Sequence, residues 1–392
     1  MVIITATVGV MRTNRTRAGR ALVGCAAGVI IGTMSSGESS DIPEASVVIP
    51  TFNRCAVLER CLAALARQTR ANFEVIVVDD GSTDDTVAML ERLRAAHPGL
   101  RLRWFVNESN RGANASRNRG TEAAQGSIVA FLDSDCVAEP DWLERLLEGF
   151  SHERVAAVTG LVLDLPPTNV YELAFKGTNR VHGRGAASRL VGGNMAVRRA
   201  LLRRINWDED RRFQAMERAG VPDVTNSGGC DEEGIYLILK WAGYEQRVVP
   251  AARVLHEHTY DRRAFYRQAY YGGGSAAHLV WKYRLWHRLD IVPLIVAYLL
   301  LLGTAALPRL AGGAGAILAV WLAAVSYNEI ARKNKTLIET LRSLPWVIAY
   351  YHVRALGYAR ETVRLWTGRR RIARIRRADA VKQLNEERPP HG

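Results

Sequence analysis

Short apolar runs alternate with amphipathic segments along the first third of the chain. SVVIP at 46–50 has the length and β-branched content of a buried strand, and EVIVV at 74–78 repeats that pattern. Between them, CAVLERCLAALAR at 55–67 shows a helical periodicity. Its leucines share one face: Leu58, Leu62 and Leu65. Together the three segments predict a strand–helix–strand unit.

The same alternation continues to about residue 132. The further predicted elements are a helix over 84–96, a strand over 101–106, a helix after Asn114 and a strand over 128–132. Ser82 and Asp85 have the spacing of a capping box at the start of the first of these helices. Because alternating strands and helices form a parallel sheet covered on both faces, we predict an α/β fold.

Polar residues gather where each predicted strand ends. The four segments are TFNR at 51–54, DDGSTD at 79–84, NESNRGANASRNRG at 107–120 and DSD at 133–135. The carboxyl ends of parallel strands meet at one edge of a sheet, and ligands bind there. A turn alone would explain any one segment. Carboxylates, amides and an arginine at four successive strand ends instead predict a single binding crevice.

The chemistry of these residues predicts a nucleoside diphosphate site. Asp133 and Asp135 follow a buried strand. Two carboxylates this close repel each other, so a cation is expected between them, such as a divalent metal that bridges two phosphates. Asp79 and Asp80 offer acceptors to a base or ribose, and Arg117 offers donors to phosphate. The sequence has no G-x-x-x-x-G-K-[ST] segment and no G-x-G-x-x-G after the first strand, which argues against a P-loop or dinucleotide fold.

The composition narrows the class of protein. The 392 residues are 48% hydrophobic, enough for a substantial core, and their net charge is +14. Such a charge suits nucleic acid, an anionic membrane or phosphorylated substrates. Five cysteines without C-x-x-C spacing argue against a zinc site or disulfide framework and fit a reducing compartment. Residues 1–43 are expected to be an extension, with Met34 as a hypothetical translation start.

Four segments together resemble the family 2 glycosyltransferases. SVVIPTFNR, VIVVDDGSTDDT, NRGANASRNRG and IVAFLDSD follow the order and spacing of that family. The resemblance covers about residues 45–275 and is weaker after 150. It implies the GT-A fold, with a Rossmann-like, mostly parallel sheet, and sugar transfer from a nucleotide sugar with inversion of the anomeric centre.

The resemblance also implies roles for single residues. The residues expected to contact the nucleotide are Pro50, Thr51, Asp79, Asp80 and Arg117. The acidic pair, Asp133 and Asp135, is expected to meet ribose and metal, usually Mg²⁺ or Mn²⁺ in this family.

In the second half, the resemblance points to the acceptor site and the base. VGGNMAVRR at 191–199 resembles the family's acceptor-side segment, and CDEEGIYLILKWAGYEQRVVP at 230–250 resembles its helix with the catalytic carboxylate. The usual Glu-Asp order is reversed here, so Asp231 and Glu232 both remain candidates for the base, with Glu232 favoured by alignment from AGYEQRVVP. The alternative is that these carboxylates have only a structural role, because acidic side chains stabilise the N-terminus of a helix.

Two further features follow residue 255. HEH at 256–258 suggests an additional metal or diphosphate ligand, and His258 is preferred over His256. A surface histidine pair is the alternative. The Q-x-x-R-W segment of processive family members is absent after Gln268, which indicates a non-processive enzyme.

The chain turns apolar beyond residue 285. The uncharged runs 291–307 and 311–327 predict a transmembrane hairpin, with a buried helical pair as the alternative. Basic residues flank its outer ends, which by the positive-inside rule places both termini in the cytoplasm. A basic run at 368–377 and an amphipathic segment at 344–359 predict contact with anionic lipid rather than nucleic acid.

These patterns divide the chain into five parts. They are an extension (1–43), a nucleotide-sugar half (44–150), an acceptor half (151–280), the hairpin (281–335) and a cytoplasmic tail (336–392). The resulting prediction is a metal-dependent, inverting glycosyltransferase at the cell membrane, with its catalytic domain facing the cytoplasm. A UDP-sugar is the favoured donor, and the acceptor is a glycolipid, lipid carrier or surface glycan. The alternatives are a non-catalytic membrane scaffold that binds sugar nucleotides and a nucleotidyltransferase.

Overall fold

The computed structural model describes residues 42–176, 185–186, 189–209, 232–257, 260–284, 292–304, 307, 310–369 and 371–385. The predictions for residues 1–41, Asp231 and His258 fall outside these ranges. The strands are β1 (Ala45–Thr51), β2 (Phe73–Asp79), β3 (Arg101–Val106), β4 (Ile128–Leu132), β5 (Cys136–Ala138), β6 (Val155–Asp164), β7 (Gly185–Ala186), β8 (Asn194–Arg198) and β9 (Glu245–His256).

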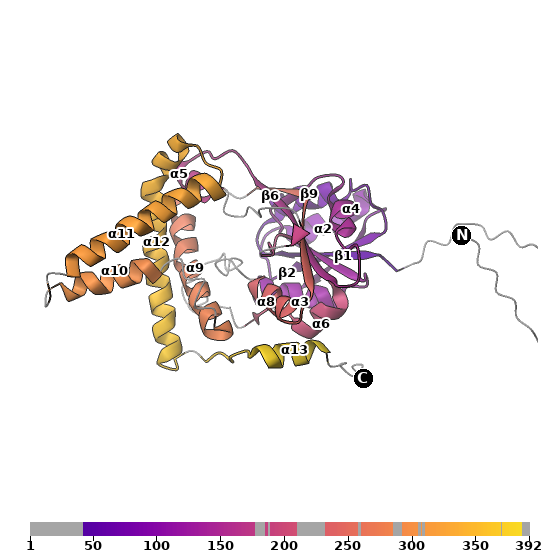
Figure 1. Cartoon of the computed structure of the whole chain (residues 1–392). Coiled ribbons are helices and arrows are strands. Elements are labelled where there is room, and N and C mark those ends of the chain that lie inside the picture. Colours follow the sequence, from indigo (N-terminus) through magenta and orange to yellow (C-terminus); the bar gives the residue numbers. More distant parts are fainter. Residues whose placement is uncertain are drawn as a thin grey trace, which may run out of the picture. The chain divides into compact units, whose positions relative to one another are not determined.

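Helices surround and follow the sheet (Figure 1). Those that alternate with or cover the strands are α1 (Cys55–Leu65), α2 (Thr86–Ala96), α3 (Ala113–Ala123), α4 (Trp142–Glu148), α6 (Arg199–Ile205), α8 (Glu233–Trp241) and α13 (Arg377–Asn385). A second group comprises α5 (Val170–Phe175), α9 (Arg262–Tyr283), α10 (Val292–Gly303), α11 (Leu310–Tyr327), the π-helix η3 (Asn328–Arg332) and α12 (Leu337–Trp366).

The sheet has the strand order β3-β2-β1-β4-β8-β6-β9-β5, with β7 paired to β9. The first four strands along the chain are parallel, as the alternation of strands and helices predicted. From β8 onward the sheet is mixed, because β8 runs antiparallel to both β4 and β6. The parallel half therefore sets the carboxyl ends of β1, β2 and β4 at one edge.

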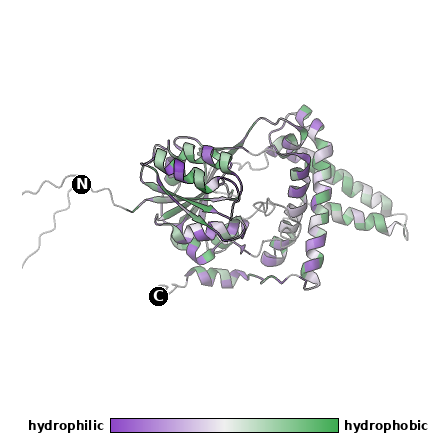
Figure 2. Ribbon diagram, turned by 180° about the vertical axis from the view of Figure 1, so that it is seen from behind, coloured by the Kyte–Doolittle hydropathy of each residue, from purple (hydrophilic) through white to green (hydrophobic). Residues whose placement is uncertain are grey.

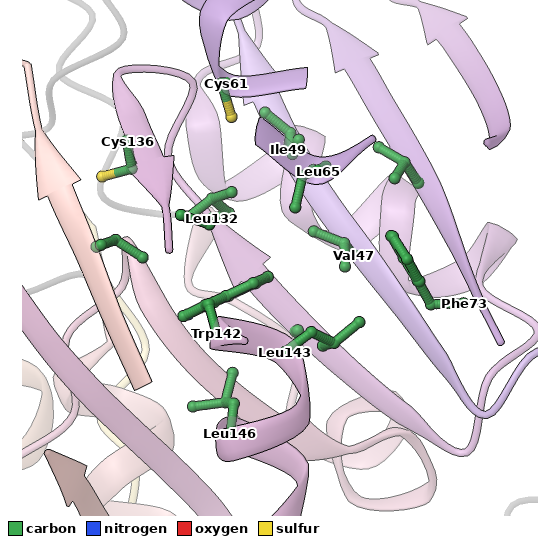
Figure 3. Close-up of a cluster of buried hydrophobic side chains, with 14 of the residues drawn as sticks. Val47, Ile49, Cys61, Leu65, Phe73, Leu132, Cys136, Trp142, Leu143 and Leu146 are labelled. Carbon is green, nitrogen blue, oxygen red and sulfur yellow. The ribbon is translucent and has the colours of Figure 1, made fainter. Parts of the chain in front are cut away.

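Successive residues of the parallel strands enter two cores on opposite faces of the sheet. Val47 and Ile49 pack with residues of α1, α2 and α4, whereas Val48 packs with residues of α6, α8 and α13. Figure 3 shows the first cluster, in which Trp142 lies among aliphatic side chains from several strands and helices. Burial on both faces explains why these strands read as continuous apolar runs.

The start of α2 differs from the prediction. Its N-cap is Asp85, whose side chain makes no capping hydrogen bond, so the expected capping box is wrong. Ser82 instead donates its backbone N–H and its hydroxyl to Asp79 Oδ1. Asp84 accepts from the backbone N–H and the hydroxyl of Thr86. The polar residues of this loop therefore organise the end of β2 before the helix begins.

Helices α9 and α12 pack side by side with their backbones in close approach (Figure 1). A methyl group on Gly273 would lie 1.8 Å from the carbonyl oxygen of Arg354, and one on Gly357 would lie 1.8 Å from that of Tyr270. Two glycines, one on each helix, thus permit this crossing. Side chains of α5, α9, α10, α11 and α12 form a third core that is rich in aromatic rings.

The apolar pair α10 and α11 pack against each other, and both are strongly hydrophobic along their length (Figure 2). Among the described residues, one helix is long and apolar enough to cross a membrane, namely Ala311–Arg332, which comprises α11 and η3. The 12 residues of α10 extend only about 18 Å, against a hydrocarbon core of about 30 Å. In the part of the chain that the structure describes, the predicted hairpin is therefore a helix pair with one candidate span.

The segment after α12 returns to the sheet domain. The backbone N–H of Ile375 donates to the carbonyl oxygen of Lys282 at 3.0 Å, and Gln383 donates to that of Arg204 at 2.6 Å. The guanidinium of Arg374 lies 4.4 Å from the ring centroid of Trp281. Arg374 and Ile375 of the basic run thus contact α9, and α13 packs against α6 and α8.

Candidate active site

The ends of β1 and β2 place two unpartnered polar atoms side by side. Thr51 pairs with Asp79 in the parallel register, directly after Pro50 pairs with Val78. Asp79 Oδ1 accepts from Ser82, but Asp79 Oδ2 and Thr51 Oγ1 are buried and have no hydrogen-bond partner in the described part of the chain. Burial raises the pKa of Asp79. Since buried polar atoms normally have partners, this pair indicates a place for a polar ligand.

Asp80 faces the loop between β3 and α3. Its carboxylate accepts from Asn107 Nδ2 at 2.7 Å, from the N–H of Arg111 at 2.9 Å and from the N–H of Gly112 at 2.6 Å. Three donors from one loop show that Asp80 fixes the path of the chain into α3. Its predicted contact with a nucleotide stays a prediction.

Arg117 of α3 reaches the first carboxylate after β4. Its Nη2 donates to Asp133 Oδ1 at 2.9 Å, and its Nη1 donates to Asn114 Oδ1 at 3.0 Å. The guanidinium also lies over the indole of Trp207, 4.6 Å from the ring centroid. Because Arg117 is buried, a hydrogen bond, an ion pair and a cation–π contact together fix its orientation.

Asp135 lies between an arginine and a histidine. Arg54, just before α1, donates to Asp135 Oδ2 at 2.5 Å, and His256 Nε2 lies 3.6 Å from Asp135 Oδ1. His256 ends β9 and pairs with Cys136 of β5, which explains how a residue 121 positions away (256 − 135) arrives here. Burial alone would lower the pKa of His256, but the charges of Asp135 and Asp133 outweigh it and the pKa is raised.

The Asp135–His256 pair fits a divalent cation. His256 Nε2 and Asp135 Oδ1 lie 3.6 Å apart, and a carboxylate oxygen with an imidazole nitrogen would suit Mn²⁺ as ligands. Cys136 also has its sulfur nearby, but burial raises the pKa of its thiol well above the ordinary value. The sequence favoured His258, and the structure places His256 beside Asp135.

Two glycines bring the proposed base toward the acidic pair. A methyl group on Gly192 would lie 3.3 Å from Glu232 Oε2 and 3.9 Å from Arg117 Nη2, and one on Gly193 would lie 2.6 Å from Asp133 Oδ2. Glu232 is the N-cap residue of α8. The VGGN segment therefore lies between the start of α8 and the end of β4, where any side chain would displace a carboxylate.

A buried ionic network behind the site gave no sequence signal. Asp208 accepts from His278 Nε2 at 2.9 Å and from Lys282 Nζ at 2.7 Å, both on α9. The backbone of Trp207 exchanges two hydrogen bonds with the amide of Asn118. This network holds the Trp207–Asp208 segment against α3 and so keeps the indole under Arg117. Separations of 70 and 74 residues hide such contacts in a sequence.

Residues 46–205 match the family model described as glycosyl transferase family 2. This part of the chain is a family 2 glycosyltransferase domain. It covers the parallel half of the sheet, Asp79, Arg117, both aspartates of the acidic pair and the VGGN segment. The recognition made from four sequence segments is confirmed.

Curated relatives of the family 2 domain match it over limited lengths. Glycosyltransferase AglE of Haloferax volcanii is 35% identical over 134 residues, which are 34% of this chain and 41% of that protein. The GalNAc(5)-diNAcBac-PP-undecaprenol beta-1,3-glucosyltransferase of Campylobacter jejuni is 34% identical over 116 residues, 28% of this chain and 37% of that one. The chain spans less than half the length of these relatives.

A solved structure extends the likeness beyond the family 2 domain. The mannosyltransferase PcManGT from Pyrobaculum calidifontis, in complex with GDP-Man and Mn²⁺, has a TM-score of 0.50 at 20% identity. The alignment covers 82% of this chain and 88% of that chain. At this identity the likeness concerns the fold, and it confirms the predicted GT-A class.

Proposed function

We propose that the protein is a metal-dependent, inverting, non-processive glycosyltransferase that moves one sugar from a nucleoside diphosphate sugar to a hydroxyl acceptor. The observation that carries the proposal is the arrangement around the acidic pair. Asp135 has a histidine beside it, Asp133 has Arg117, and Glu232 lies across Gly192 and Gly193. This arrangement would supply a cation site, an arginine for phosphate and a carboxylate base near one edge of the sheet.

The donor would bind from β1 toward β4. Asp79 and Thr51 have buried acceptor atoms for the base or ribose, with Pro50 and Asp80 at the adjoining strand ends. Asp133 and Asp135, with a histidine, would hold Mg²⁺ or Mn²⁺, which when bound stabilises negative charge on the departing diphosphate. Arg117 would donate hydrogen bonds to the donor phosphates, or would orient Asp133, the carboxylate expected to meet the ribose. A UDP-sugar is the favoured donor.

The transfer itself needs a base on the acceptor side. Glu232 would accept the hydroxyl proton as the acceptor oxygen bonds to the anomeric carbon and the bond from that carbon to the phosphate oxygen breaks. One in-line displacement inverts the configuration, and the nucleoside diphosphate leaves. Asp231, which precedes it, is the other candidate for this role.

Membrane attachment would supply a lipid-linked or glycolipid acceptor. Leucines of α10 and the apolar side of α11 are exposed on the protein, including Leu299, Leu302 and Val320. Along α12, exposed apolar residues recur at helical spacing: Leu337, Leu341, Leu356, Val363 and Trp366. Basic residues at both outer ends of the pair would keep the catalytic domain at the cytoplasmic face, against anionic lipid.

Thermal unfolding with a panel of donors tests the proposal. With Mn²⁺ present, the protein should be stabilised by the sugar nucleotides of one base, and Asp135→Ala should abolish that stabilisation. Arg70→Met provides a control, since Arg70 pairs with Glu44 away from the site. No metal-dependent shift with any nucleotide sugar would contradict the proposal.

A further inference from the structure

The turn that carries Arg54 is fixed to the loop that carries Asp79. Asn53 has a left-handed backbone (φ 51°), which asparagine tolerates better than most residues. Its N–H donates to Ser82 Oγ and its Oδ1 accepts from the N–H of Thr83, both at 2.8 Å. The N–H of Cys55 donates to Asp84 at 3.0 Å. The backbone on both sides of Arg54 is thus bound to the end of β2.

The side chain of Arg54 leads from this turn to the proposed cation site. Its Nη1 donates to Asp135 Oδ2 at 2.5 Å, on the side of the carboxylate opposite the oxygen nearest His256. Arg54 therefore lies between the residue with the unpartnered acceptor, Asp79, and the residue expected to hold the metal. In a nucleoside diphosphate the two phosphates lie between the nucleoside and the cation they bind.

The charges at the site favour the same placement. Without ligand, the carboxylates of Asp133 and Asp135 are balanced by the guanidinium groups of Arg117 and Arg54. A divalent cation on Asp135 would sit a few ångströms from Arg54, and like charges that close repel. A diphosphate relieves the repulsion, because it is attracted to both. The planar guanidinium also matches phosphate oxygens in geometry.

We propose that Arg54 binds the diphosphate of the donor, and that in the ligand-free protein it occupies Asp135 as a substitute countercharge. This assignment rests on the proposed function, since it requires a nucleoside diphosphate at the site. It adds Arg54 to Arg117 as a second arginine for the donor phosphates.

The two roles predict opposite effects of one substitution. Arg54→Met removes the repulsion, so Mn²⁺ alone should bind about threefold to tenfold more tightly. It also removes a charge-assisted hydrogen bond, so UDP or GDP with saturating Mn²⁺ should bind at least about tenfold more weakly. The corresponding nucleoside, which has no phosphate, should bind with unchanged affinity. Arg54→Lys keeps the charge and should lie between the wild type and Arg54→Met in both measurements.

The experiment measures free Mn²⁺ by electron paramagnetic resonance and nucleotide affinity by calorimetry, on the full chain in detergent. Arg70→Met is the matched control, because Arg70 pairs with Glu44 before the amino ends of β2 and β1, whereas the acidic pair follows the carboxyl end of β4. Unfolding midpoints within a few degrees would show that the variants remain folded.

The outcomes separate this assignment from the proposed function. If the wild type binds a nucleoside diphosphate and Arg54→Met binds it equally well, the assignment fails and the proposed function stands. If Arg54→Met weakens Mn²⁺ alone, Arg54 only orients Asp135 and the assignment also fails. If the wild type binds none of UDP, GDP, dTDP and CDP with Mn²⁺, both fail together.

Discussion

The guanidinium of Arg117 lies 4.6 Å from the centroid of the Trp207 indole and donates a hydrogen bond to Asp133 Oδ1. Trp207 in turn meets Phe131 of β4 edge to face, with centroids 4.9 Å apart. The strand that delivers Asp133 and the ring that supports Arg117 are therefore packed together. We regard Trp207 as the residue that sets where Arg117 points.

Two substitutions of Trp207 should separate the contribution of its aromatic ring from that of its indole N–H. Its indole N–H has no hydrogen-bond partner in the described part of the chain, so Trp207→Phe should retain most stability and donor affinity. Trp207→Ala leaves a cavity and should cost about 3–5 kcal/mol of stability, with weaker binding of the nucleoside diphosphate. Unfolding and calorimetry test this. Equal nucleotide affinity in the Ala and Phe variants would refute the positioning role.

Gly193 should tolerate no side chain. Gly193→Ala would place a methyl group 2.6 Å from Asp133 Oδ2, so the carboxylate must move away from Arg117. We expect Mn²⁺-dependent donor binding to fall about tenfold or more, as for loss of a charge-assisted contact. Gly99→Ala is the control, because a methyl group there meets nothing within 4 Å. Unchanged donor affinity in Gly193→Ala would show that Asp133 does not take part.

The contacts of Asp208 with His278 and Lys282 should make the free energy of unfolding depend on pH in the acidic range. Burial alone would raise the pKa of Asp208, but His278 and Lys282 outweigh it and hold the pKa well below its usual range. A carboxylate whose pKa is lower in the folded state than in the unfolded state stabilises the folded protein. This stabilisation is complete above the ordinary pKa of about 4, and it is lost as the pH falls toward the pKa of the folded state.

Asp208→Asn should therefore cost about 3–5 kcal/mol at pH 7, because it leaves the buried ammonium of Lys282 without its carboxylate and also removes the hydrogen bond to His278. The difference from wild type should narrow as the pH is lowered below about 4. Unfolding midpoints of both proteins across this range measure it. Asp141→Asn, which affects an exposed pair with Arg145, should have little effect at any pH. A constant difference would contradict the assigned role.

The sequence predicted the residues that depend on local pattern. Asp79, Asp133 and Asp135 follow strands that are buried on both faces, so their apolar runs marked the edge where they would meet. Arg117 followed because helix α3 begins in the loop at that edge. These positions required only strand direction and the right-handed crossover of parallel units.

Residues that depend on strand pairing in the second half could not be placed in this way. The choice between His256 and His258 depends on β9 meeting β5, with His256 opposite Cys136, and no local pattern encodes that pairing. Arg54 ends the TFNR segment, but its partner, Asp135, lies 81 residues away. Ser82 has the spacing of a cap, yet its hydroxyl donates to Asp79 and accepts from the N–H of Asn53 instead of from the helix.

If α11 attaches the protein to a membrane, a charge introduced on α11 should have a larger effect than the same charge introduced on β3. Val320 on α11 is 71% exposed, and Val320→Arg should shift the protein from the membrane fraction toward the soluble or aggregated fraction. Val106→Arg introduces the same charge at an exposed valine of β3 and should leave the distribution unchanged. Carbonate washing of membranes, followed by quantitative blotting, measures both. Equal distributions for the two variants would contradict attachment through α11.

The most direct test of the account is release of nucleoside diphosphate from the donor identified by thermal unfolding, compared for wild type, Glu232→Gln and Asp231→Asn. We expect Glu232→Gln to reduce kcat by about 10²–10⁴ while the affinity for donor and Mn²⁺ stays within about twofold, because the base acts on the acceptor. Asp231→Asn should retain most activity. Full turnover by Glu232→Gln, with or without loss in Asp231→Asn, would contradict the account of the base beside the VGGN segment.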